Sequence, residues 1–126
     1  MVAVLVDVSR EVVEKIAVEQ NASGWRRIIH ANSLALLRRR IGDHDYIIVC
    51  DKDSQTEKNS TPSSKTTDGA VDLHGSFLVL AEAWWDSPCL RGLCKEEVDE
   101  VFAAIIEMPR TAADLCGVGL LTACLD

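Results

Sequence analysis

The chain has 126 residues, the length of one ordinary domain, and its 48% apolar content is typical of a folded protein rather than a disordered one. Its net charge of −7 disfavours binding to nucleic acids or anionic membranes and favours basic protein partners. The charge is uneven, because residues 51–126 hold six Lys/Arg against fourteen Asp/Glu, whereas residues 1–50 hold seven against six. We therefore expect a single domain, residues 1–126, with an acidic second half.

The first half of the chain predicts two strands connected by helices. Residues 2–8 form an apolar run, and residues 46–50 form a second one that is typical of a strand buried on both faces. Ser9 is a good helix N-cap, so we expect a helix up to about residue 20, followed by a second helix over residues 25–41. A break at residues 32–33 is the alternative for that second helix. The order favours a parallel βαβ unit, with an antiparallel sheet as the alternative.

The second half begins with a polar segment. Residues 52–69 contain eight Ser/Thr and no large apolar side chain, which predicts a flexible loop. Residues 76–85 favour a third strand. Residues 95–108 carry apolar side chains at helical spacing and predict the most regular helix of the chain. Residues 112–125 are apolar almost all round and predict a last helix, either buried or at a contact with another copy.

Together these elements predict an α/β or α+β fold. We expect a small central sheet of about three strands flanked by four or five helices, with one long polar loop at residues 52–69. The start of the chain has no basic residues and reaches Asp7 too early for a signal peptide, and no apolar run approaches the roughly 20 residues of a membrane span. Five cysteines cannot all pair within one chain, so we expect reduced thiols and a cytoplasmic protein.

Three aspartates lie at or just after predicted strand ends, namely Asp7, Asp51 and Asp53. At the edge of a parallel sheet such carboxylates converge where Mg²⁺ binds. The stretch Val4-Leu5-Val6-Asp7-Val8-Ser9 resembles the opening strand of PIN-type nucleases, whose first metal-binding aspartate occupies the position of Asp7. The resemblance covers six residues and ends at residues 10–11, where those nucleases continue with apolar side chains. It implies a metal-dependent nuclease or phosphodiesterase as an alternative function, whereas turn formation and capping are the ordinary uses of such aspartates.

The cysteines, histidines and arginines give weaker indications. Cys89 and Cys94 have a spacing that would suit two zinc ligands or a redox pair, but a structural zinc site usually has tighter C-x2-C pairs. The three histidines lie in unrelated contexts, and no catalytic triad pattern is present. Residues 38–40 are consecutive arginines that would suit a nucleic acid, but we favour compensation of a helix dipole and pairing with the acidic half. We expect no cofactor.

The sequence favours a binding surface over an active site. Tryptophan is enriched at interface hot spots, and two adjacent tryptophans are followed by an acid and, ten residues later, by an acidic helix start. The predicted surface consists of Trp84, Trp85, Asp86, Glu96, Glu97, Asp99 and Glu100.

This surface leads to a prediction of function. We expect a small acidic binding or inhibitory protein, not an enzyme, that presents carboxylates to a basic protein partner. Immunity proteins and antitoxins that neutralise bacterial toxins have this character. The remaining alternative is a structural subunit that forms a homo-oligomer through residues 112–125.

Overall fold

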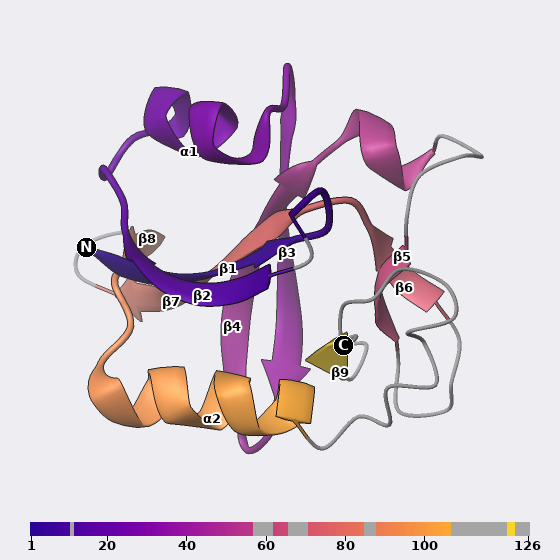
Figure 1. Ribbon diagram of the computed structural model, residues 1–126. Helices are drawn as coiled ribbons and strands as arrows, with labels where there is room; N and C mark the ends of the chain where they lie inside the picture. Colours follow the sequence, from indigo (N-terminus) through magenta and orange to yellow (C-terminus); the bar gives the residue numbers. More distant parts are fainter. Residues whose placement is uncertain (11, 57–61, 66–70, 85–87, 107–120, 123–126) are drawn as a thin grey trace.

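The computed structural model describes residues 1–10, 12–56, 62–65, 71–84, 88–106 and 121–122. Its centre is a six-stranded antiparallel sheet in which five strands follow the order β2-β1-β7-β4-β3 (Figure 1). The sixth strand, β8, pairs with the second half of β7, beyond the stretch of β7 that pairs with β1. The strands of this sheet are β1 (Val2–Asp7), β2 (Val12–Ala17), β3 (Leu34–Ile41), β4 (His44–Asp51), β7 (Phe77–Trp84) and β8 (Pro88–Arg91).

Two α-helices lie on opposite faces of this sheet (Figure 1). The short helix α1 (Ala22–Ile29) packs on one face and the longer α2 (Lys95–Ile106) on the other. A second, smaller sheet lies at the side and consists of β5 (Pro62–Lys65), β6 (Val71–His74) and β9 (Leu121–Thr122), with the single 3-10 turn η1 (Asp53–Gln55) before it. None of the helices in the described ranges combines the length and apolarity needed to cross a membrane.

The expected three-stranded sheet with four or five helices is wrong. The first expected helix is instead the strand β2, because the chain turns back at residues 8–10 and pairs with all of β1, from Asp7↔Val12 to Val2↔Ala17. Asp7 forms this turn, since its Oδ1 accepts hydrogen bonds from the backbone N–H groups of Ser9 (3.0 Å) and Arg10 (3.2 Å). The N–H groups of Ser9 and Arg10 therefore bond to a carboxylate at the end of β1 and form a turn. Ser9 lies in this turn and does not cap a helix.

The second expected helix is also wrong beyond its first turns. α1 ends at His30, whose φ of 56° is left-handed and whose N–H bonds to the helix. After the break at residues 32–33, which was the alternative, the chain forms β3 rather than a further helix. Gly42 has a left-handed φ of 64°, but it serves the tight turn between β3 and β4 instead of a helix end.

The parallel βαβ unit is wrong as well, because β7 lies between β1 and β4 and runs antiparallel to both. Strand formation at residues 2–7, 46–50 and 77–84 is confirmed, and so is the helix that begins at Lys95. Tyr46, Ile48 and the rest of residues 46–50 are buried, as a central strand requires. The predicted helix over residues 112–125 lies outside the described residues except at Leu121–Thr122, which form the strand β9.

Two apolar layers result from the alternation of side chains along the strands. On the α2 side the core contains Val4, Val6, Tyr46, Ile48, Cys50, Phe77 and Val79 of the sheet with Val98 and Val101 of the helix. On the α1 side it contains Ala3, Leu5, Val49, Leu78 and Leu80 with Trp25 and Ile29. β1, β4 and β7 supply both layers, and for this reason their apolar residues are continuous in sequence.

We expect Gly42→Ala to lower the free energy of unfolding by about 1–2 kcal/mol, measured by urea denaturation. The left-handed φ disfavours any side chain, and a Cβ at this position would lie 2.8 Å from Cγ of Glu100 and 2.9 Å from its Cδ. Gly24→Ala is the comparison, because Gly24 lies in α1 without a left-handed φ and a Cβ there would lie 3.0 Å from Cβ of Glu19, a less severe contact than at Gly42. A smaller cost of Gly42→Ala in a Glu100→Ala background would show that Glu100 contributes to it, and a cost no larger than that of Gly24→Ala would contradict the prediction.

Candidate protein-binding surface

Four of the predicted surface carboxylates lie in the first two turns of α2, and the structure divides them into two pairs. Glu97 and Glu100 lie three residues apart and therefore on one side of the helix, directed at the rest of the molecule. Glu96 and Asp99 lie on the exposed side. The predicted acidic surface is thus half structural and half available to a partner.

Glu97 holds the start of α2 in place. Its carboxylate accepts two hydrogen bonds from the Arg91 guanidinium, at 2.6 and 2.8 Å, and a third from the backbone N–H of Cys94 at 2.9 Å. The last of these satisfies an N–H group at the helix start, as in a capping box. The Arg91 pair is the main reason why the pKa of Glu97 falls from its ordinary value to about 2.

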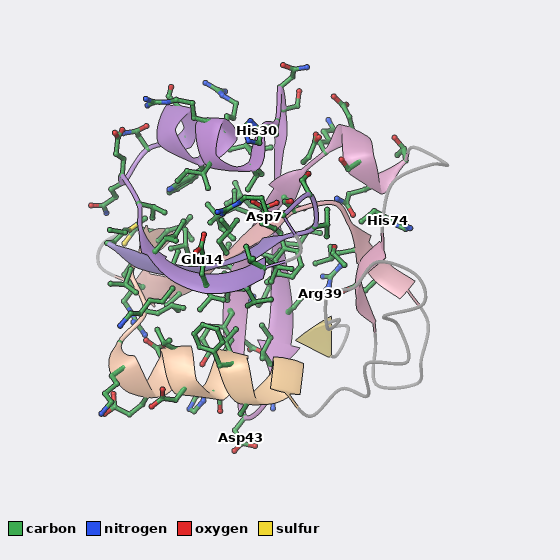
Figure 2. All side chains as sticks on the ribbon, in the orientation of Figure 1. Asp7, Glu14, His30, Arg39, Asp43 and His74 are labelled. Atoms are coloured by element: carbon green, nitrogen blue, oxygen red, sulfur yellow. The ribbon has the colours of Figure 1, made fainter. Side chains whose placement is uncertain are left out.

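Glu100 joins α2 to the turn between β3 and β4. It accepts hydrogen bonds from the Tyr46 hydroxyl (2.5 Å) and the backbone N–H of Asp43 (3.2 Å), and its Oε1 lies 2.8 Å from Nδ1 of His44. Burial and this carboxylate together raise the pKa of Tyr46. Figure 2 shows Asp43 at the tip of this hairpin, next to α2. We call Glu100, Tyr46, His44 and Asp43 the hairpin clamp.

The hairpin clamp also determines the pKa of its exposed member. The hydrogen bond to Glu100 is the largest reason why the pKa of His44 is raised, and the charge of Glu100 adds to it. Burial acts to raise the pKa of Glu100, but the bonds from Tyr46 and His44 outweigh it and lower that pKa. Within the clamp, the protonated form of His44 and the charged form of Glu100 therefore stabilise each other.

Asp99 of the exposed pair lines a cavity at the start of α2. The structure records no ion pair for Glu96 or Asp99 within the described part of the chain. The cavity has a volume of about 280 Å³ and is lined by Val2, Lys15, Leu93, Cys94, Lys95, Val98 and Asp99. The lining combines the apolar side chains of Val2, Leu93 and Val98 with one acidic residue, Asp99, and two lysines. Such a cavity suits a long side chain with an apolar stem.

The aromatic part of the predicted surface is not settled by the structure. Trp84 is the last residue of β7, and its backbone lies opposite Pro88. The side chain of Trp84 and all of Trp85 and Asp86 lie outside the described residues. Their place beside α2 stays a prediction.

The predicted metal ligands come to the same edge of the sheet but are already engaged. Because β1 and β4 both run antiparallel to β7, Asp7 and Asp51 end up on either side of its first residue. The Oδ2 of Asp7 accepts a hydrogen bond from Nε of Arg10 at 2.7 Å. Asp51 accepts hydrogen bonds from the backbone N–H of Asp53 and the hydroxyl of Ser54, and so starts the turn η1.

These contacts assign turn roles to the carboxylates of Asp7 and Asp51, whereas Asp53 takes part in η1 through its backbone. Burial acts to raise the pKa of Asp7, but the bonds and charge of Arg10 outweigh it and hold that pKa below its ordinary value. Across the described ranges, no group of three or more His, Cys, Asp or Glu side chains is placed to hold a metal ion. The contacts thus favour a structural role of these residues over the role of metal ligands in a nuclease.

Cys89 and Cys94 do not form a joint site. Both are free thiols, and they line different cavities on opposite sides of the sheet. Cys50 is buried and free, as expected of a core residue, and burial raises the pKa of its thiol to about 11.

The three arginines are not in a helix but in β3, where Arg38 pairs with Glu82 and Arg39 with Asp72. Figure 2 shows Arg39 reaching from β3 towards the smaller sheet. The expected pairing with the acidic half is confirmed for Arg38 and Arg39, whereas Arg40 pairs with Asp45 of the first half. Dipole compensation is wrong, because these residues form a strand.

Comparison with known proteins adds no function. No protein-family model, no curated protein and no solved structure matches the chain. The proposals below therefore rest on its own residues and geometry.

Two functional candidates were missed by sequence reasoning, and only one of them had a readable signal. The hairpin clamp depends on a contact between residues 54 to 57 positions apart, which no local pattern shows. The outer edge of β3 was hidden by the expectation of a helix. Its signal was the segment Leu34-Ala35-Leu36-Leu37 directly before the arginines, which is apolar without helical spacing.

Proposed function

We propose that this protein is a binding protein that acts on a basic protein partner through the first two turns of α2. The observation that supports it best is the exposed pair Glu96 and Asp99, without ion pairs in the described structure, with Asp99 at a cavity. We call this region the α2 surface, defined by Glu96, Asp99 and the cavity. A Lys or Arg of the partner would pair with Glu96 or Asp99 on the exposed side of α2.

The fixed position of α2 supports this proposal. Arg91 and the hairpin clamp hold the inner side of the helix at two points, through Glu97 and Glu100. A surface that is already rigid loses little conformational entropy when it binds. Glu97 and Glu100 would thus act by positioning the α2 surface, while Trp84, Trp85 and Asp86 remain proposed as an aromatic contact on its border.

The proposal includes a cytoplasmic location and an inhibitory mode. Cys50, Cys89 and Cys94 are free thiols, which suits a reducing compartment. An acidic surface that covers a basic active site would block it directly and would speed the encounter by electrostatic attraction. No chemistry by the protein itself is required.

The test is a native pull-down from a lysate of the source organism at low and at moderate salt. We expect a basic protein to be retained at low salt and released as the salt concentration rises. With that protein purified, Glu96→Ala/Asp99→Ala should reduce the association rate constant about three- to tenfold at low salt and weaken its salt dependence.

A matched control separates the α2 surface from net charge. Glu19→Ala/Asp53→Ala removes the same two negative charges from exposed positions outside α2. It should leave the association rate nearly unchanged. Equal effects of the two double variants would remove the α2 surface from the proposal, and retention of no basic protein at low salt would reject the function.

A further inference from the structure

The outer edge of β3 is the second surface that the structure offers. β3 pairs with β4 along all of its eight residues, and no other strand in the described ranges pairs with it. The backbone N–H of Lys52 donates to the carbonyl of Ser33 at 3.0 Å, which fixes the phase of the hydrogen-bond ladder. Since bonded and non-bonded pairs alternate in antiparallel strands, the outward N–H and C=O groups belong to Leu34, Leu36, Arg38 and Arg40. The carbonyl of Arg38 agrees, because it accepts a hydrogen bond from the Arg39 side chain rather than from β4.

The side chains of these four residues lie on the α1 side of the sheet, where α1 leaves part of the face open. Leu36 is 54% exposed, and it is the exposed large hydrophobic residue of the described structure. Beside it lies an open cavity of about 240 Å³ lined by Trp25, Leu36, Ile47, Glu82, Cys89 and Leu90. An edge strand with an exposed leucine beside a partly apolar cavity can pair with another strand.

The charges of β3 do not prevent such pairing. Arg38 lies 2.6 Å from Glu82, Arg39 lies 2.8 Å from Asp72, and Arg40 lies 3.4 Å from Asp45. Each arginine thus has a carboxylate of its own chain beside it. The edge consists of an apolar half, residues 34–37, and a neutralised arginine half, residues 38–40.

We propose that the outer edge of β3 pairs antiparallel with β3 of a second copy, with the two-fold axis at Leu37. In this register Leu36 lies opposite Arg38 of the second copy, and Leu34 lies opposite Arg40. Every outward N–H and C=O group then faces one of the other strand, and no arginine faces an arginine. The aliphatic part of each arginine covers a leucine, which is how long cationic side chains cover apolar surface.

The neighbouring registers are worse. With the axis at Leu36, Arg40 extends past the end of the other strand, and with the axis at Arg38 the two Arg38 side chains face each other. Pairing of β3 with β2, the edge strand at the other end of the sheet, would be head-to-tail and would give a ring or a filament instead of a two-fold dimer. The self-pairing is small compared with the roughly 1,600 Å² of a standard interface, so the dimer should be weak and reversible.

Sedimentation velocity over a concentration series from about 1 to about 500 µM tests this dimer, in the range expected of a small interface. We expect a reversible monomer–dimer equilibrium. Leu36→Arg places an arginine opposite Arg38 of the second copy on both sides of the axis and should weaken dimerisation about tenfold or more. Ala17→Arg, at an exposed position of β2, is the matched control and should not change it. Thermal melts check that both variants are folded.

Two cysteine variants test the register. With the axis at Leu37, the two copies of residue 37 form a non-hydrogen-bonded pair about 4.5 Å apart, within the range of a disulfide, whereas the two copies of residue 36 are about 7–8 Å apart. Under a mild oxidant Leu37→Cys should therefore cross-link faster than Leu36→Cys on a non-reducing gel.

Each contrary result has a defined meaning. A monomer at all concentrations, or a dimer that Leu36→Arg leaves unchanged, would overturn the pairing, and faster cross-linking of Leu36→Cys would overturn the register. The inference does not depend on the α2 surface, so Glu96→Ala/Asp99→Ala should leave the dimer as it is. Loss of partner binding and loss of dimerisation can thus be told apart.

Discussion

Glu100→Ala is expected to lower the free energy of unfolding by about 3 kcal/mol in urea denaturation at pH 7. The substitution removes the acceptor of the hydroxyl of Tyr46, a buried side chain, so the O–H group loses its partner within the protein. It also frees the backbone N–H of Asp43 and the ring of His44. The hairpin clamp is then lost as a whole.

The comparison variants separate the hydrogen bond from the loss of charge. Glu100→Gln keeps an acceptor for Tyr46 and should cost less than Glu100→Ala. Asp99→Ala removes a neighbouring exposed carboxylate and should stay within about 0.5 kcal/mol of the wild type. Tyr46→Phe should recover part of the loss in a Glu100→Ala background, because it removes the unpaired hydroxyl. If Glu100→Ala and Asp99→Ala cost the same, the hairpin clamp does not stabilise the fold.

Glu97→Ala is expected to cost about 2 kcal/mol at pH 7, because it removes both the Arg91 pair and the hydrogen bond to the N–H of Cys94. The cost is no larger because Arg91 is 46% exposed and water partly screens its pair with Glu97. Glu97→Gln keeps an acceptor for Cys94 and should cost about half as much. Urea denaturation measures both.

The pH dependence of the Glu97 variants has a defined sign. The pKa of Glu97 is lowered in the folded protein, from an ordinary value of 4.5 to about 2, so its charged form stabilises the fold. This contribution is fully present above about pH 4.5 and is lost as the pH falls towards about 2. The difference between the wild type and Glu97→Gln should therefore be constant near neutrality and shrink in that acidic range. A difference that grows on acidification would contradict the assignment.

The sequence predicts the central strands well because they are buried on both faces. Residues 46–50 are apolar at every position, which is typical of a central strand or a buried helix. A run of five residues is too short for a helix, so the pattern predicts a strand. The same reasoning works for α2, where Val98, Val101 and Phe102 recur at helical spacing.

The edge strands are not predictable in the same way. β2 and β3 are the edge strands of the sheet's main path in the described part of the chain, and their sequences show no strict alternation of apolar and polar residues. In β2 the apolar positions Val12, Val13 and Ile16 fit a helix as well as a strand, and the Asp7 turn that decides between them depends on a side-chain contact. The acidic start of α2 was half predictable. The four carboxylates of its first two turns are visible in the sequence, but only the positions of Arg91 and Tyr46 in space show which of the four form hydrogen bonds within the protein.

The position of β7 between β1 and β4 has a consequence for how the chain folds. The β1–β2 and β3–β4 hairpins are local and can form early. In the described sheet they do not pair with each other, because β7 lies between them. They are joined only when Phe77 and its neighbours pair with Val6 on one side and Cys50 on the other, across 71 and 27 residues of chain respectively. The nucleus of the sheet therefore has a high contact order, and folding should be slow for a chain of this length. During synthesis the inner strands of the two hairpins stay unpaired and apolar until β7 leaves the ribosome. We expect chaperones to bind the chain in that interval.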